Sequence, residues 1–89
     1  MKTFAVERSL KGISMEALRG AQKAAIAKAA EMTAAGTPLS YMHSVPHAGD
    51  GRNLCLFQVE SAAHVETLNR DADISFDRVS EAMHLPPTD

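Results

Sequence analysis

Apolar and polar residues alternate at the start of the chain, where Phe4 and Val6 stand between Thr3 and Glu7. A hydrophobic period of two residues is typical of a strand and predicts one over residues 2–8.

From Met15 the apolar residues recur every three or four positions instead, which predicts a helix over residues 15–35. Ser14 is a good N-cap, because its hydroxyl can accept a hydrogen bond from an otherwise unpaired backbone N–H. Gly36 is placed to adopt the left-handed conformation that ends many helices. The expected inward stripe is rich in alanine, which favours close packing of the helix on a sheet: Leu18, Ala21, Ala25, Ala29 and Met32.

The second half of the chain reads as a hairpin, a short helix and a last strand. Residues 37–46 and 53–59 are strand-like, and Ala48-Gly49-Asp50-Gly51 supplies the turn between them. Ser61 can cap a helix that continues to Ala72. A final strand over residues 76–85 stops at two prolines.

This order of elements is that of the ferredoxin-like βαββαβ fold, an α+β sandwich. Right-handed crossovers then place both helices on one face of a four-stranded antiparallel sheet. The 89 residues are expected to form one domain, residues 1–89.

The second face of the sheet is expected to be covered as well. Leu54, Cys55, Leu56 and Phe57 are four consecutive apolar residues, whereas a half-exposed strand alternates apolar with polar. A second copy of the chain covers such a face most simply, since a two-fold dimer packs one apolar patch against itself. The sequence therefore predicts a homodimer that pairs through the sheet; cover by a loop or the C-terminal tail is the alternative.

Charge and composition narrow the choice of partners. The formal net charge is -2, so no basic footprint for nucleic acid or an anionic membrane is present. No stretch approaches the roughly 20 apolar residues that span a bilayer, and the N-terminus lacks the apolar centre of a secretory signal. The one cysteine, Cys55, cannot form an intrachain disulfide, and we expect a cytoplasmic protein without nucleic-acid or membrane partners.

No catalytic or phosphate-binding motif is present, so the candidate chemistry rests on a few histidines, one cysteine and one glutamate. A hairpin that turns about Gly49 to Gly51 places Cys55 opposite His43 or Val45. In either register His43 and Cys55 lie on the same side of the sheet, within about 5 to 8 Å at the β-carbons.

Glu7 ends a strand that the fold places beside the strand of Cys55, and its carboxylate could join them. Such a set of nitrogen, sulfur and oxygen ligands suits nickel, zinc or cobalt better than calcium or magnesium. His47 is a fourth candidate ligand, but four strand residues separate its α-carbon from that of His43 by about 13 Å unless Pro46 bends the strand. Cys55 as a buried apolar residue, His43 as a hydrogen-bonded interface residue and Glu7 as a partner of Arg8 or Arg78 are the structural alternatives.

Several short motifs occur in a familiar order over nearly the whole chain. They are Val6-Glu7-Arg8-Ser9-Leu10 with Gly12, Gly36-Thr37-Pro38, Tyr41-Met42-His43-Ser44, the run from Asp50 to Phe57, and Phe76-Asp77-Arg78-Val79. Together they resemble a bacterial family of small ferredoxin-like proteins that includes nickel-binding, nickel-responsive dimers. The resemblance implies a homodimer with a divalent-metal role and carries that role to Glu7, His43 and Cys55. A nickel site at the dimer surface, with His47 or His84 as ligand, is the alternative that the resemblance leaves open.

Three functions are compatible with these observations. The first is a nonenzymatic homodimer that binds a divalent metal ion, with nickel as the expected metal and His43, Glu7, Cys55 and His47 as candidate ligands. The second is a dimeric α/β-barrel-type protein, a small-molecule binder or an enzyme, with His43 as acid or base in a pocket between helix and sheet. The third is an interaction domain without a ligand.

Overall fold

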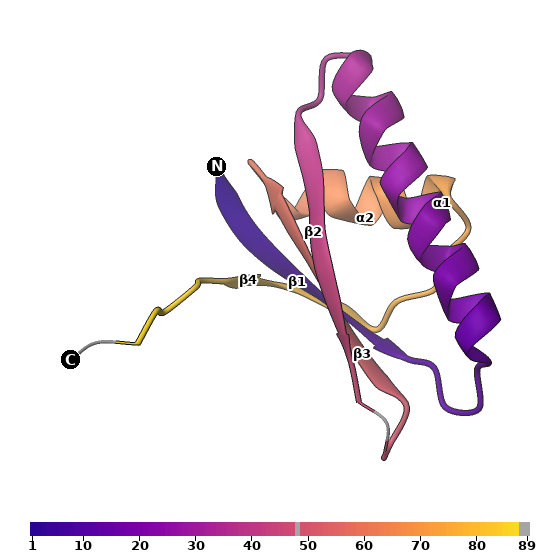
Figure 1. The fold of residues 1–89 in the computed structure, drawn as a ribbon. Coiled ribbons are helices and arrows are strands. Elements are labelled where there is room, and N and C mark those ends of the chain that lie inside the picture. The colour runs from indigo at the N-terminus through magenta and orange to yellow at the C-terminus, as the bar shows by residue number, and fades with distance from the viewer. Residues whose placement is uncertain (48, 88–89) are drawn as a thin grey trace.

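The computed structural model describes residues 1–47 and 49–87 and has the predicted βαββαβ order (Figure 1). The elements are β1 (Lys2–Ser9), α1 (Met15–Ala34), β2 (Leu39–Pro46), β3 (Arg52–Val59), α2 (Ala62–Asp71) and β4 (Arg78–Ala82). Of the predicted turn Ala48-Gly49-Asp50-Gly51, Ala48 lies outside the described residues. Within the described parts of the chain, neither helix is long and apolar enough to cross a membrane.

The residues that the sequence predicted to begin and end the helices have these roles, with one exception. The Ser14 hydroxyl accepts a hydrogen bond from the Ala17 amide at 3.1 Å, and Gly36 follows α1 with a φ of 105°. Ser61 occupies the N-cap position of α2 in an extended conformation, but its side chain makes no capping hydrogen bond, so that part of the prediction was wrong.

The four strands form one antiparallel sheet in the order β2-β3-β1-β4. Both helices lie on the same side of it (Figure 1). The core lies between the helices and this side of the sheet and consists of Phe4, Val6, Ala25, Ala29, Leu39, Cys55, Phe57, Val59, Val65 and Leu68. The predicted ferredoxin-like sandwich is therefore confirmed.

The last strand is shorter than the predicted range 76–85. Ladder pairing between β4 and β1 ends where Ala82 faces Thr3, because β1 itself begins at Lys2 and offers little further backbone to pair with. The segment after Ala82 therefore leaves the sheet, and its side chains Met83 and Leu85 are 81% and 85% exposed.

One irregularity in β2 determines which side chains point to which side of the sheet. Tyr41 lies opposite Phe57, but the next pairs are His43 with Leu56 and Ser44 with Cys55, so the register shifts by one residue at Met42. A β-bulge of this kind inserts one extra residue and reverses the inward and outward alternation beyond it. Tyr41 and Ser44 consequently both point to the helix side.

Candidate functional site

His43 and Cys55 lie on opposite sides of the sheet. Ser44, not His43 or Val45, faces Cys55, because the hairpin closes with His47 against Arg52 and an even number of residues lies between them. Cys55 is buried among core residues under the helices, whereas His43 is exposed on the other side. The predicted His43 and Cys55 cluster was therefore wrong, and Cys55 takes the alternative role of a buried residue.

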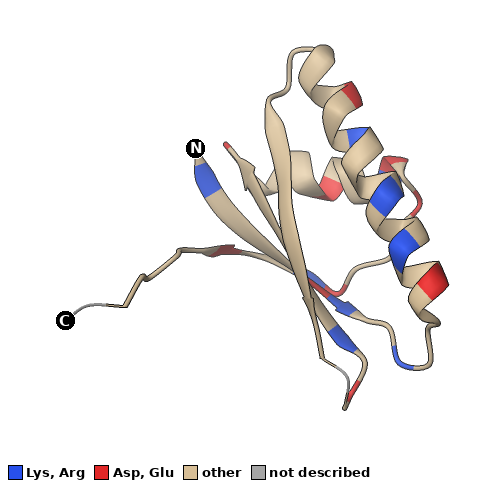
Figure 2. Cartoon of the chain, viewed as in Figure 1, with Lys and Arg blue, Asp and Glu red and all other residues tan. Residues whose placement is uncertain are grey.

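We call the side of the sheet without helices the open face; its residues include Thr3, Ala5, Glu7, Ser40, His43, Val45, Leu54, Leu56, Gln58, Arg78 and Ser80. β2, an edge strand of this face, contains no charged residue, whereas charged residues occur on both helices and on the other three strands (Figure 2). Val45 is 43% exposed, and Leu54 and Leu56 are partly exposed. The middle of the open face is thus apolar, as its sequence indicated, and polar residues such as Thr3, Ser40 and Gln58 lie toward one end of its strands.

Glu7 lies on the open face but not beside His43. It is paired with Leu54 on one side and with Arg78 on the other, and its Oε2 forms an ion pair and hydrogen bond with the Arg78 Nε. His43 is two strands away, and two strand spacings amount to about 9.6 Å. The Arg78 alternative for Glu7 is confirmed, and within one chain Glu7 and His43 are too far apart to share a metal ion.

A second histidine approaches His43 on the open face. The ring centroids of His43 and His84 are 6.5 Å apart with an angle of 43° between the rings, and both residues are exposed. His84 belongs to the segment that leaves the sheet after β4. His43 comes from one edge strand, β2, and His84 from the segment that follows the other edge strand, β4. The two imidazoles therefore lie close together on the open side of the sheet.

His47 follows β2 at the closing pair of the hairpin, where its amide donates to the Arg52 carbonyl at 2.7 Å. Its side chain is exposed and lines a surface depression of about 410 Å³ that also includes Glu7 and Asp77. No described contact joins His47 to His43.

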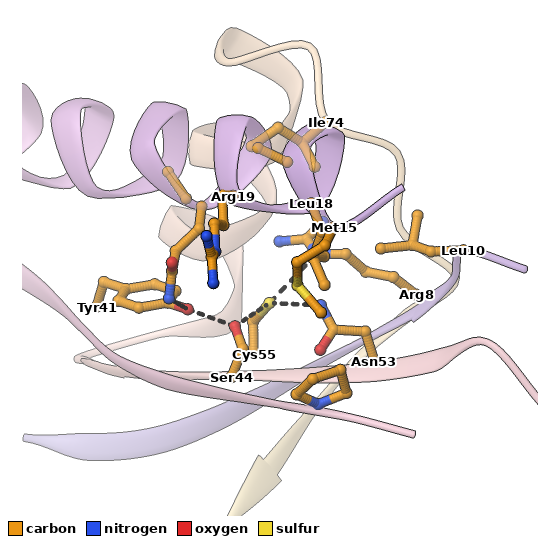
Figure 3. A pocket seen from close by; sticks show the side chains of 14 residues that line it. Arg8, Leu10, Met15, Leu18, Arg19, Tyr41, Ser44, Asn53, Cys55 and Ile74 are labelled. Atoms are coloured by element: carbon orange, nitrogen blue, oxygen red, sulfur yellow. Dashed lines mark hydrogen bonds between the residues drawn. The ribbon is translucent and has the colours of Figure 1, made fainter. Parts of the chain in front are cut away.

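A separate pocket of about 160 Å³ lies on the helix side, between α1 and the sheet (Figure 3). We call it the helix-side pocket; it is lined by Arg8, Leu10, Met15, Leu18, Arg19, Ala21, Gln22, Ala25, Tyr41, Ser44, Pro46, Asn53, Cys55 and Ile74. His43 is not among these residues. A role for His43 as acid or base in a pocket between helix and sheet is therefore excluded for this pocket by its position on the open face.

The polar residues of the helix-side pocket form a continuous hydrogen-bonded chain (Figure 3). Gln22 on α1 donates to the Tyr41 hydroxyl at 2.9 Å, and that hydroxyl is hydrogen-bonded to Ser44. The Ser44 hydroxyl is 3.1 Å from the Cys55 sulfur, which also lies 3.4 Å from the Arg8 Nε. The chain of contacts thus runs from α1 across β2 and β3 to β1.

Arg8 is the functional candidate that the sequence patterns did not single out. It is in phase with Phe4 and Val6, which point inward, and it is 3% exposed. The alternation of inward and outward residues that predicted the strand therefore also indicates that Arg8 points inward.

Comparison with known proteins shows which family the chain belongs to. Residues 4–82 match the family described as "Nickel responsive protein SCO4226-like". The chain belongs to this SCO4226-like family. The match spans most of the sequence and confirms the resemblance drawn from the short motifs.

A solved structure gives the same fold. The crystal structure of SCO4226 from Streptomyces coelicolor A3(2) is 20% identical to this chain and superimposes with a TM-score of 0.79, covering 94% of this chain and 99% of that one. At this identity the likeness bears on the fold alone. A search of the curated proteins finds no match.

The family name raises the question of whether these residues fit a nickel ion. Within residues 1–47 and 49–87, no three His, Cys, Asp or Glu side chains are grouped so that they could hold a metal ion. The His43 and His84 pair fits the chemistry, since imidazole is a good ligand for nickel. The described part of one chain of this SCO4226-like protein therefore offers two ligands of a suitable type but not a complete set.

Proposed function

We propose that the protein is a nickel-binding homodimer that pairs through the open face of its sheet and holds the metal with His43 and His84 of both subunits. The observation that carries the proposal is the 6.5 Å separation of two exposed imidazole rings on the side of the sheet that no helix covers. The family description, which names a nickel-responsive protein, supports the choice of metal.

The ligand count favours a site shared between two chains. Two imidazoles from each subunit would supply four nitrogen ligands around a two-fold axis, and a square-planar nitrogen set suits Ni²⁺ or Cu²⁺. In a symmetric dimer the same surface of each subunit meets at the two-fold axis. A pair of histidines close to this axis therefore meets the same pair from the second subunit. Glu7, His47 and Cys55 are not needed for this set, and zinc or cobalt would be accommodated less well by a planar site.

The open face has the properties of a surface that a second copy covers. Val45 is exposed, and Leu56 lies in the middle of the face. Met83 and Leu85, in the segment that follows β4, are exposed apolar residues as well. Burial of one such side chain contributes roughly 1.5 to 3 kcal/mol, so several together can offset the entropic cost of association.

A binding protein without catalytic activity is the simplest form of this function. The metal would be the ligand rather than a cofactor, and His43 would serve as a ligand rather than as an acid or base. The cytoplasmic location expected from the single cysteine is part of the proposal.

Calorimetric titration with nickel, run together with a mass measurement by light scattering, tests the proposal. We expect a dimer that binds one nickel ion per two chains, and at least about a tenfold loss of affinity in His43→Ala and in His84→Ala. His64→Ala is the matched control, because His64 lies on α2 at the covered side of the sheet, and its affinity should equal that of the wild type. A monomer, or unchanged nickel binding in His43→Ala, would reject the shared site.

A further inference from the structure

Arg8 is a buried charge without a charged partner in the described part of the chain. It is 3% exposed, and arginine keeps its charge in proteins. The ion pairs among the described residues are Lys28 with Glu31, Arg52 with Asp50 and Arg78 with Glu7, none of which includes Arg8. Because removing a charge from water is costly unless an opposite charge compensates it, the site calls for an anion.

The hydrogen bonds of Arg8 leave part of the guanidinium free. Its Nη1 donates to the Ser75 carbonyl at 2.9 Å and its Nε to the Cys55 sulfur at 3.4 Å. A guanidinium has five N–H donors; among residues 1–47 and 49–87 no hydrogen bond is described for the Nη2 amino group, which is not one of the fully buried unpaired atoms and so keeps some exposure. Donors therefore remain for a ligand in the helix-side pocket, which Arg8 lines.

Asn53 gives an independent indication of a ligand. It is directly opposite Arg8 in the pairing of β1 with β3, is 3% exposed and lines the same pocket. Its Nδ2 donates to the Cys55 sulfur at 3.5 Å, while its Oδ1 is buried and has no hydrogen-bond donor among the described residues. Buried polar atoms are normally paired, so this oxygen calls for a donor group such as a hydroxyl.

The remaining walls of the pocket are apolar. Leu18, Ala21 and Ala25 of α1 form one side and Ile74 contributes to another, while the exposed Arg19 stands among the lining residues of α1. A cavity of about 150 Å³ holds a molecule of the size of benzene, and this pocket measures about 160 Å³. The body of a fitting ligand is therefore compact and apolar.

We infer that the helix-side pocket binds a small hydroxycarboxylate with a compact apolar body, its carboxylate on Arg8 and its hydroxyl donating to Asn53 Oδ1. The two polar groups of such a ligand are adjacent because Arg8 and Asn53 are cross-strand neighbours. A carboxylate supplies the missing negative charge, and guanidinium to carboxylate hydrogen bonds are among the strong ones. This binding activity goes beyond the proposed nickel site and lies on the opposite side of the sheet.

Three matched small molecules test the inference by heteronuclear NMR on the full chain without metal. 2-Hydroxyisobutyrate carries both groups on a body of two methyl groups, isobutyrate lacks the hydroxyl, and 2-hydroxyisobutyramide lacks the charge. We expect saturable shifts of the Arg8 and Asn53 amide resonances with 2-hydroxyisobutyrate, weaker binding of isobutyrate, and binding of the amide at least about tenfold weaker, since a hydrogen bond to a charged group contributes that much.

Asn53→Asp is the decisive variant, because it places a carboxylate directly opposite Arg8 and supplies the counter-charge from within the chain. We expect it to lower the affinity for 2-hydroxyisobutyrate at least about tenfold. Gln58→Glu is the matched control, with the same change of charge at an exposed position of the same strand, and should bind as the wild type does. Ala21→Phe fills the pocket without altering Arg8 and should abolish binding even if Asn53→Asp does not fold.

Equal affinity for 2-hydroxyisobutyrate and its amide, unchanged affinity in a folded Asn53→Asp or in Ala21→Phe, or no saturable shift at millimolar 2-hydroxyisobutyrate would overturn the inference. The last result would mean that the charge of Arg8 needs no ligand to compensate it. None of these outcomes bears on nickel binding, which the calorimetric titration tests separately.

Discussion

Ser44 lies directly opposite Cys55 in the pairing of β2 with β3, and its hydroxyl oxygen is 3.1 Å from the cysteine sulfur. Through this contact the hydrogen bonds of Tyr41 on β2 connect to the buried guanidinium of Arg8 on β1. The helix side of the sheet therefore contains a polar network inside an otherwise apolar core. Such networks stabilise a fold only when their members are satisfied, which makes each member sensitive to substitution.

Tyr41→Phe is expected to destabilise the protein by about 1 kcal/mol, because it leaves Gln22 and Ser44 without their shared partner. The ring itself, which packs edge-on against Phe57 at 5.4 Å between centroids, is retained. Urea unfolding followed by circular dichroism measures the change. Ser40→Ala, at an exposed position of the same strand, should be neutral; equal stability of Tyr41→Phe and the wild type would show that the network contributes nothing.

Cys55 is expected to react slowly with thiol reagents in the native protein. Its side chain is 5% exposed under the helices, so a reagent must wait for local opening of the structure. The comparison is Cys55→Ala combined with Ala27→Cys, which moves the thiol to an exposed position of α1; the native thiol should react at least about tenfold more slowly. Similar rates at the two positions would contradict the placement of Cys55.

The sequence predicted the fold well because each element has a local signal. The period-two pattern of β1, the Ser14 cap and the Gly36 end of α1 are properties of neighbouring residues, and the structure has all three. The order of the elements then leaves few possible topologies. The element order and the family resemblance were therefore accessible from residues alone.

The candidate site was harder to predict from the sequence, because it depends on the register between the strands. One extra residue at Met42 and the length of the hairpin turn decide which side of the sheet His43 occupies, and a shift of one residue reverses that side. Contacts between distant segments, such as His43 with His84, depend on where the chain runs after β4. No local pattern in the sequence carries that information.

Leu56→Lys is expected to convert the proposed dimer into a folded monomer. Leu56 lies on the open face opposite both His43 and Ala5, so a lysine there would bury a charge in the interface without touching the core under the helices. Sedimentation equilibrium gives the mass, and circular dichroism shows whether the fold is kept. Ala27→Lys, at an exposed position of α1 on the other side of the sheet, should remain a dimer, and a dimeric Leu56→Lys would indicate a different interface.

Glu7→Gln is expected to cost no more than about 1 kcal/mol, because its partner Arg78 is 68% exposed and exposed ion pairs contribute little. Nickel affinity should not change, since Glu7 and His43 do not approach each other within a chain. Thermal unfolding and the nickel titration measure the two effects. A large loss of nickel affinity would return Glu7 to the ligand set.

X-ray absorption at the nickel edge tests the metal site most directly, because it reports which atoms bind the ion. The proposed site predicts imidazole nitrogen ligands, a signal that is lost in His43→Ala, and no sulfur neighbour, since Cys55 lies across the sheet. A spectrum with a sulfur ligand, or one that His43→Ala leaves unchanged, would contradict the account.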